Sequence, residues 1–309
     1  MSFAPVVLFA YSRPEHTRLT VEALKLNKGA SETDLHVYSD GPRDAQQSAA
    51  VQEVRSYLRT IDGFKSVILV ERARNMGLAA SVIAGVTELL SRHPAVIVVE
   101  DDLVTAPTFL SFMNVALTTY AEQKQVFSVT GYNYPLPIPA DYPEEAYLSY
   151  RSSSWGWGTW TDRWSKVDWD VGDFDVFLQD KKARNRFARG GDDLLPMLQK
   201  QLNGELDSWS IRFDYAHYKH DAMCLHPVRS KLRNIGFDGS GVHCGVSDEF
   251  DSELDSDERE FRLRPDLQPD PAILRIFDQR FRSPGVRAAL RVSLLKRALR
   301  RIGSLIGTN

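Results

Sequence analysis

The chain has 309 residues, of which 43% are hydrophobic and 26% charged, a composition that excludes disordered and fibrous proteins. Its 38 basic and 41 acidic residues leave a net charge of −3, so it lacks the basic field expected of a nucleic-acid-binding protein. Two cysteines, Cys224 and Cys244, are too few for a disulfide framework or, by themselves, a four-ligand zinc site. No window approaches the roughly 18 apolar residues of a membrane span.

Short apolar runs alternate with amphipathic stretches from residue 5 to about residue 130. This alternation predicts βαβ units, and hence an α/β fold with a mostly parallel sheet flanked by helices. The predicted strands are residues 6–11, 35–39, 67–70, 96–99 and 127–130. The predicted helices are residues 15–27, 44–59 and 77–92, with a fourth after Pro107 for which Thr105 is the expected N-cap.

Polar residues follow each of the first three strands. Arg13 follows the first and Asp40 the second, while Arg74 lies in the loop after the third, where backbone N–H groups could hold a phosphate. Each could instead be an ordinary turn or surface residue. Because open α/β sheets bind ligands at the carboxyl ends of their strands, the set together predicts a site for a nucleotide diphosphate.

The fourth strand ends in three consecutive acidic residues, Glu100, Asp101 and Asp102. Like charges this close repel one another, so we expect a cation beside them. Carboxylates at a strand end, with phosphate and water completing the shell, suit Mn²⁺ or Mg²⁺. The alternative is a solvated acidic loop that caps the next helix.

Beyond residue 131 the chain becomes rich in proline and aromatic residues and is predicted to loop over the sheet. Trp160 and Trp164, four residues apart, are expected to lie in the core. Trp155 and Trp157 alternate with glycines and could line a sugar-binding site, because aromatic rings stack on the C–H faces of sugars. Burial in the core is the alternative for these two as well.

Residues 234–243 form a glycine-rich stretch that predicts a lid over bound nucleotide, to which Gly239 and Ser240 would contribute. His243 is either a metal ligand or a structural histidine. The lysine of an ATPase phosphate loop is absent. Further upstream, Asp207 or Ser208 could cap a helix, or a carboxylate at this place could be a general base made more basic by burial beside Trp209.

The C-terminal part differs in charge from the rest. Residues 246–265 are strongly acidic and are expected to be mobile and without chemistry. Residues 266–309 are predicted to be a helical tail, and its part from 285 to 309 has six basic residues and no acidic one. This part is expected either to dock on the protein or to lie on an anionic membrane surface.

The order of these motifs resembles that of the GT-A glycosyltransferases. The shared features are an arginine after strand one, an aspartate after strand two, a Val-Val-Glu-Asp-Asp segment followed by Ala-Pro-Thr-Phe, a Trp-Gly-Trp-Gly-Thr-Trp stretch, an Asp-x-Trp and a final glycine-rich loop. The resemblance covers about residues 4–245 and is closest to the N-acetylglucosaminyltransferase I family and its bacterial sugar-transferase relatives. It implies a GT-A domain over residues 1–245, with a nucleotide-binding half (1–130) and an acceptor-side half (131–245).

Roles for individual residues follow from this resemblance. Arg13 and Asp40 would contact the nucleotide, Glu100 and Asp101 the ribose and donor sugar, and Asp102 the Mn²⁺. The family has adjacent aspartates before the tryptophan, where this chain has Asp207 and Ser208. We therefore expect Asp207 to be the catalytic base, with Glu205 as the second candidate.

The expected function is metal-dependent transfer of a hexose or N-acetylhexosamine, with inversion, from a nucleotide sugar to a glycan or lipid-linked acceptor. A UDP-sugar is the expected donor, and the expected location is the cytoplasm, at the inner face of a bacterial plasma membrane if the tail binds lipid. One alternative is a sugar nucleotidyltransferase, which would need a glycine-rich loop where residues 11–14 read Tyr-Ser-Arg-Pro. The other is a catalytically inactive carbohydrate-binding protein, consistent with Ser208 in place of an aspartate.

Overall fold

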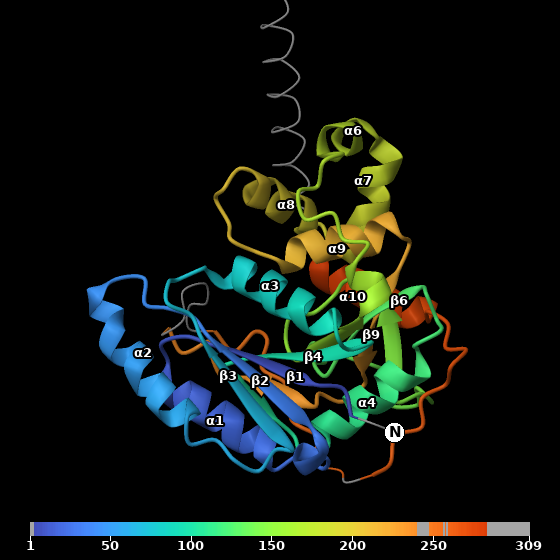
Figure 1. The fold of residues 1–309 in the computed structure, drawn as a ribbon. Helices are drawn as coiled ribbons and strands as arrows, with labels where there is room; N and C mark the ends of the chain where they lie inside the picture. The colour runs from blue at the N-terminus through green and yellow to red at the C-terminus, as the bar shows by residue number, and fades with distance from the viewer. Residues whose placement is uncertain (1–2, 240–246, 256, 258, 283–309) are drawn as a thin grey trace, which may run out of the picture.

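The computed structural model describes residues 3–239, 247–255, 257 and 259–282 (Figure 1). Within these residues the central sheet has eight strands in the order β3-β2-β1-β4-β8-β6-β9-β7. The first four neighbours are parallel: β3 (Ser66–Glu71), β2 (Asp34–Ser39), β1 (Val6–Ala10) and β4 (Ala95–Glu100). The predicted α/β class is confirmed, and these strands lie close to their predicted bounds.

The other half of the sheet is mixed rather than parallel. Strand β8 (Trp157–Trp160) runs antiparallel to both β4 and β6 (Val126–Thr130). Next, β9 (Met223–Pro227) is parallel to β6, and β7 (Ala146–Ser149) is antiparallel to β9. The sequence pattern missed β7, β8 and β9, because their partners are distant in the chain and the tryptophan-rich stretch shows no simple alternation.

Both faces of the sheet are covered by helices, which explains the continuous apolar runs in its strands. Helices α1 (Pro14–Lys25), α2 (Ala45–Leu58) and α4 (Phe109–Thr119) cover one face, and α3 (Leu78–Leu90) lies on the other (Figure 1). Alternate residues of β1 enter the two layers: Val6 and Leu8 pack in the core with α1, whereas Val7 and Phe9 pack in the core with α3.

The start of α4 corrects one expectation. Thr105 does not cap this helix, because it lies in the short strand β5 (Leu103–Thr105). Asn27 serves the helix start from outside: its Oδ1 accepts a hydrogen bond from Leu110 N at 2.9 Å, while its Nδ2 donates to Thr105 Oγ1 at 2.9 Å. A cap supplied by a residue this far along the chain leaves no local sequence signal.

A second, smaller sheet pairs β5 with β10 (Leu232–Asn234), which run antiparallel with Leu103 opposite Asn234. Because β5 begins directly after Asp102, this pairing brings the glycine-rich stretch that follows β10 onto the acidic residues.

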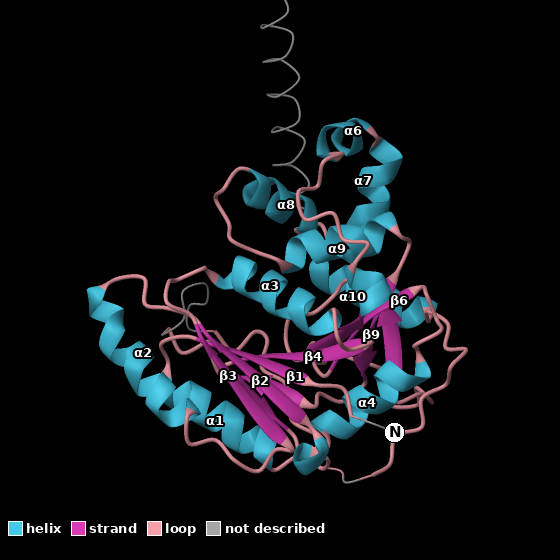
Figure 2. Cartoon of the chain, viewed as in Figure 1, coloured by secondary structure: helices cyan, strands magenta, loops and turns pink. Residues whose placement is uncertain are grey.

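Short helices form a third layer on the α3 side of the sheet (Figure 2). They are α6 (Phe174–Gln179), α7 (Lys181–Phe187), α8 (Leu194–Leu202) and α9 (Ser210–Lys219), with the 3-10 turn η2 (Ala188–Gly190) directly after α7. Helix α5 (Thr161–Trp164) directly follows β8 and packs Trp164 in the core with α3, and the 3-10 turn η1 (Ala30–Glu32) precedes β2. Their own apolar core includes Phe177, Phe187 and Leu198. Tyr215 on α9 belongs to the same cluster, so this layer is held by packing among its helices.

The described part of the acidic segment packs on the domain, and its expected mobility stays a prediction. Asp255 is buried and forms an ion pair with buried Lys231. Phe250 O accepts a hydrogen bond from Tyr132 Oη at 2.6 Å, and Phe261 lies in the main core. Ion pairs with Lys231, Arg229 and Arg233 offset part of the like charge in the segment.

Helix α10 (Pro271–Phe281) follows and buries Ile273 and Phe277 in the same core. The basic part of the tail, residues 285–309, lies outside the described residues. Among the residues that the structure describes, no helix is both long and apolar enough to span a bilayer.

Candidate functional site

The site is built on the edge of the sheet at which β1 to β4 end, here called the carboxyl rim. Because these four strands are parallel and in register, the residues that follow them meet at this one edge. The structure places two separate groups of polar side chains there, one around Asp102 and one around Asp40.

The first group joins the strand-end acids to Arg13. Arg13 Nη2 lies 2.5 Å from Asp101 Oδ1 and 2.9 Å from Asp102 Oδ2. The second oxygen of Asp101 accepts a hydrogen bond from Tyr11 N at 3.1 Å. The structure thus brings together four residues that the sequence predicted to share a site: Arg13, Glu100, Asp101 and Asp102.

Charge in this group is incompletely balanced, since one guanidinium faces three carboxyl groups. Burial, followed by the charges of Asp102 and Asp101, raises the pKa of Glu100 to about 8. Burial and the charge of Asp101 also raise the pKa of Asp102 above its ordinary value, although Arg13 opposes the shift. The environment therefore favours an additional cation.

One carboxylate oxygen of Asp102 makes no hydrogen bond to the described residues. Its side chain is 11% exposed, and its Oδ1 is buried without a hydrogen-bond partner among the described residues. Within the described part of the chain, no three His, Cys, Asp or Glu side chains converge as a ready-made metal site. The free oxygen fits a Mn²⁺ or Mg²⁺ ion whose other ligands come from phosphate and water, the usual arrangement for Mg²⁺.

The glycine-rich stretch covers this group directly. Ile235 N donates to Asp102 O at 2.9 Å, and Gly236 N donates to Asn234 Oδ1 at 2.7 Å. A Cβ at position 236 would overlap Asp102 Oδ2, so only glycine allows this approach. His16 Nε2 lies 3.1 Å from Asp238 Oδ2 and ties the stretch to α1.

Three residues predicted from this stretch are only partly placed. Gly239 directly follows Asp238 and is described, with a φ of 85° that favours glycine. Ser240 and His243 lie outside the described residues, so their predicted roles in binding nucleotide and metal stay predictions.

The second group surrounds Asp40, which is buried. Its two carboxylate oxygens accept hydrogen bonds from the backbone N–H groups of Gly41, Met76 and Gly77 at 2.9–3.1 Å. Gly41 lies so close to the backbone of Arg74 that a Cβ would approach Arg74 C to 2.5 Å. The carboxylate of Asp40 therefore fixes the loop before α3.

This arrangement corrects the expected phosphate cradle in the loop after β3. The N–H groups of Met76 and Gly77 are bonded to Asp40 and are not free for a phosphate. The Arg74 side chain is exposed. A nucleotide contact by Asp40 or Arg74 stays a prediction, but the N–H groups of Met76 and Gly77 would not contribute to it.

The two candidate bases differ in where they point. Asp207 is exposed and its Oδ2 lies 3.5 Å from Ala79 N, at the N-terminus of α3 and hence at the carboxyl rim. Glu205 is exposed and accepts a hydrogen bond from the neighbouring Asn203 at 3.0 Å. The desolvation of Asp207 expected from Trp209 is not found, because Trp209 is buried against Trp157 with 4.5 Å between ring centroids.

The two tryptophans proposed to line a sugar site also separate. Trp157 is completely buried and stacks on Trp164 as well as Trp209, so its ring belongs to the core and the lining role is wrong in this conformation. Trp160 and Trp164 are buried, as predicted. Trp155 is only partly buried and lines a pocket.

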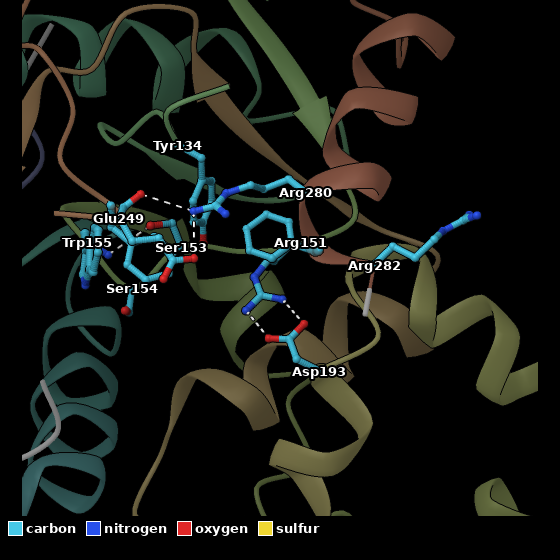
Figure 3. Close-up of a pocket in the computed structure, with 11 residues that line it drawn as sticks. Tyr134, Arg151, Ser153, Ser154, Trp155, Asp193, Glu249, Arg280 and Arg282 are labelled. Atoms are coloured by element: carbon cyan, nitrogen blue, oxygen red, sulfur yellow. Dashed lines mark hydrogen bonds and ion pairs between the residues drawn. The ribbon is translucent and has the colours of Figure 1, made fainter. Parts of the chain in front are cut away.

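This pocket has a volume of about 370 Å³ and lies between the stretch before β8 and the end of α10 (Figure 3). Its lining is aromatic and charged, and comprises Tyr134, Arg151, Ser153, Ser154, Trp155, Asp193, Glu249, Phe250, Arg280, Phe281 and Arg282. Sequence reasoning found only Trp155 among them. The others come from five separate segments with no shared motif, so no local signal could have grouped them.

Comparisons with known proteins give partial similarities. No protein-family model matches the sequence, and no curated protein matches it significantly. Among solved structures, the mannosyltransferase PcManGT of Pyrobaculum calidifontis, in complex with GDP-Man and Mn²⁺, is 15% identical, with 42% of this chain and 36% of that protein aligned and a TM-score of 0.31. TarS of S. aureus is 10% identical, with 74% of this chain and 36% of that protein aligned and a TM-score of 0.40. The chain spans little more than a third of the length of each of these proteins, and the two similarities do not assign it an activity.

Proposed function

We propose that the protein is a metal-dependent glycosyltransferase that moves a sugar from a nucleotide-sugar donor to an acceptor hydroxyl. The observation that carries the proposal is the acidic group at the carboxyl rim, where the buried Oδ1 of Asp102 has no hydrogen-bond partner among the described residues and Arg13 lies beside it. Open α/β sheets bind nucleotides at this edge. The resemblance of the sequence to the GT-A glycosyltransferases assigns the same residues to donor and metal.

Transfer of a glycosyl group leaves negative charge on the departing nucleoside diphosphate. Arg13, which donates to the carboxylates of Asp101 and Asp102, provides a guanidinium for the phosphate oxygens. When bound at Asp102, a divalent cation would supply further charge neutralisation for this leaving group. Gly236 lets the backbone of the covering stretch approach the same place and exclude water.

Glu100 has a separate role in the proposed donor site. Burial and the charges of Asp102 and Asp101 raise the pKa of Glu100, which favours its protonated form in the free protein, and a protonated carboxyl group can donate a hydrogen bond to a donor hydroxyl. Asp101, held by Arg13 and Tyr11 N, is the acceptor beside it. This pairing of one donor and one acceptor suits the neighbouring hydroxyls of a ribose or sugar.

Asp207 is the proposed general base for the acceptor hydroxyl, because it reaches the rim whereas Glu205 bonds Asn203. Direct displacement with its help would invert the anomeric configuration. UDP is the proposed nucleotide, and the donor sugar is a hexose or N-acetylhexosamine. The acceptor is a glycan or lipid-linked sugar, placed by Trp155.

Thermal-shift measurements with a panel of UDP- and GDP-sugars test the proposal. Ligands that bind the folded state raise its melting temperature by mass action. We expect a shift only when nucleotide sugar and Mn²⁺ are both present, and we expect EDTA to abolish it. A panel without any metal-dependent shift would contradict the proposal.

A catalytically inactive sugar-binding protein is the second candidate. It is favoured by Ser208, which stands where the resembled family has an aspartate, and by the exposed position of Asp207. Slow hydrolysis of a bound nucleotide sugar, measured as release of nucleoside diphosphate, separates the two. Donor binding without any release would favour the inactive protein.

A further inference from the structure

The pocket beside Trp155 lies at the same edge of the sheet as the acidic group. Trp157, the first residue of β8, is paired with Val98 of β4 and with Thr130 of β6. Because β8 runs antiparallel to both strands, the residues before Trp157 continue toward the carboxyl end of β4 and beyond that of β6. By this register Trp155 comes to the edge of the sheet at which β4 ends.

Aromatic rings connect the pocket to the glycine-rich stretch that covers the acidic group. The Trp155 ring lies 5.5 Å from that of Phe237 and 6.0 Å from that of Phe250, measured between centroids. Phe237 directly follows Gly236, which contacts Asp102. The wall formed by Trp155 thus borders the covering stretch of the proposed donor site.

The polar groups of the pocket are paired. Arg151 forms two 2.8 Å hydrogen bonds with the two oxygens of Asp193, as Figure 3 shows. Arg280 Nη2 lies 3.0 Å from Glu249 Oε1 and donates to Glu249 O at 3.2 Å. Arg282 pairs with Asp278. No lining arginine has an uncompensated charge, which disfavours an anionic ligand.

Unused hydrogen-bonding capacity remains on these pairs. Within the described residues, Arg280 bonds through Nη2 only, which leaves its Nε and Nη1 as free donors. Glu249 retains one carboxylate oxygen without a hydrogen bond to these residues. A free donor beside a free acceptor is the arrangement that neighbouring sugar hydroxyls satisfy, and the aromatic walls match the apolar face of a sugar ring.

We infer that this pocket binds a neutral pyranose unit of the acceptor. Trp155 contacts its C–H face, and Arg280 with Glu249 bonds two of its hydroxyls. The volume of about 370 Å³ falls in the range of small-molecule sites, about 300–1,000 Å³. The inference rests on the proposed function, because a glycosyltransferase needs an acceptor site at the same edge of the sheet as its donor.

Saturation-transfer NMR on the full chain tests this inference with methyl glycosides of glucose, galactose, mannose and N-acetylglucosamine, and with methyl glucuronide as the anionic probe. We expect a neutral pyranoside to bind, and Arg280→Ala to weaken its binding at least about tenfold, since hydrogen bonds to charged groups have that worth. Arg264→Ala is the matched control, because Arg264 is exposed and pairs with Glu144 and Asp266 away from the pocket.

The outcomes separate the pocket from the donor site. Calorimetric binding of the nucleotide sugar should be unchanged in Arg280→Ala, and Glu249→Gln serves as a second variant should Arg280→Ala fail to fold. A panel in which no neutral pyranoside binds, tighter binding of the glucuronide, or equal binding by wild type and both folded variants would overturn the inference. If pyranoside binding depends on Arg280 but no nucleotide sugar binds, the result would contradict the proposed glycosyl transfer and still support the pocket as a pyranose-binding site.

Discussion

Asp40 follows β2 and Asp102 follows β4, on either side of β1 in the same sheet, yet their carboxylates make different contacts. Both oxygens of Asp40 are occupied by backbone N–H groups of its own turn and of the loop before α3. One oxygen of Asp102 accepts a hydrogen bond from Arg13, and the other has no partner among the residues that the structure describes. A buried carboxylate with all its bonds made holds the structure together, whereas one with a bond missing is prepared for a ligand.

This difference separates effects on stability from effects on binding. Loss of Asp40 leaves buried N–H groups unpaired, which costs free energy of folding. Loss of Asp102 removes a carboxylate whose raised pKa shows that its charge is disfavoured in the folded protein. Four predictions test the comparison.

The largest expected effect is that of Asp102→Ala, which should abolish metal-dependent binding of a nucleotide sugar and leave the melting temperature of the free protein unchanged or higher. Calorimetric titration with Mn²⁺ present measures the binding. Asp102→Asn, with the same shape but no charge, should behave in the same way. Undiminished affinity in either variant would remove Asp102 from the metal site.

Asp207→Asn should lower turnover by about 10²- to 10⁴-fold, the usual contribution of general acid–base catalysis, with donor affinity nearly unchanged. Steady-state kinetics and calorimetry together measure both quantities. Glu205→Gln is the matched control, because Glu205 is also exposed but bonds Asn203. If only Glu205→Gln loses activity, the base has been assigned to the wrong carboxylate.

Asp40→Ala should destabilise the protein by about 1–3 kcal/mol, the cost of leaving buried polar groups without partners. Urea unfolding of the variant and of Asp102→Ala gives the comparison directly, since only the first should shift the midpoint downward. If the two variants are equally stable, the hydrogen bonds of Asp40 contribute no more to the free energy of unfolding than the contacts of Asp102.

The smallest effect concerns a fully bonded group away from the rim. His217 is buried between Ser128 Oγ and Phe213 O, both at 2.8 Å, and burial lowers its pKa to about 4. Between pH 6.5 and 4, His217 is therefore protonated in the unfolded chain but neutral in the folded protein. The free energy of unfolding falls as the pH is lowered through this range, by at most about 1.4 kcal/mol per pH unit for this group.

The His217→Gln variant isolates this contribution from that of other titrating groups. Its unfolding free energy, measured by urea titration at several pH values, should depend less steeply on pH below 6.5 than that of the wild type. Donor binding at neutral pH should not change. An identical pH dependence in the two proteins would mean that His217 is protonated without cost.

The sequence by itself determined the N-terminal half of the fold. Strands β1 to β4 and helices α1 to α3 were predictable because each carries its own periodic pattern, and the residues after the strands were predictable as site candidates because parallel strands end at one edge. That rule brought Arg13 together with Glu100, Asp101 and Asp102, but it also placed Asp40 and Arg74 with them.

Tertiary structure decided the rest, because it depends on partners far apart in the chain. The antiparallel insertion of β8 between β4 and β6 buried Trp157 and left Trp155 at the pocket. Asp40 is bonded to the backbone just before α3, and this separates it from Glu100, Asp101 and Asp102, which also stand at the end of a strand. Hydrogen bonds and burial that join distant segments give no local pattern, and they determine which of several similar side chains keeps a free atom for a ligand.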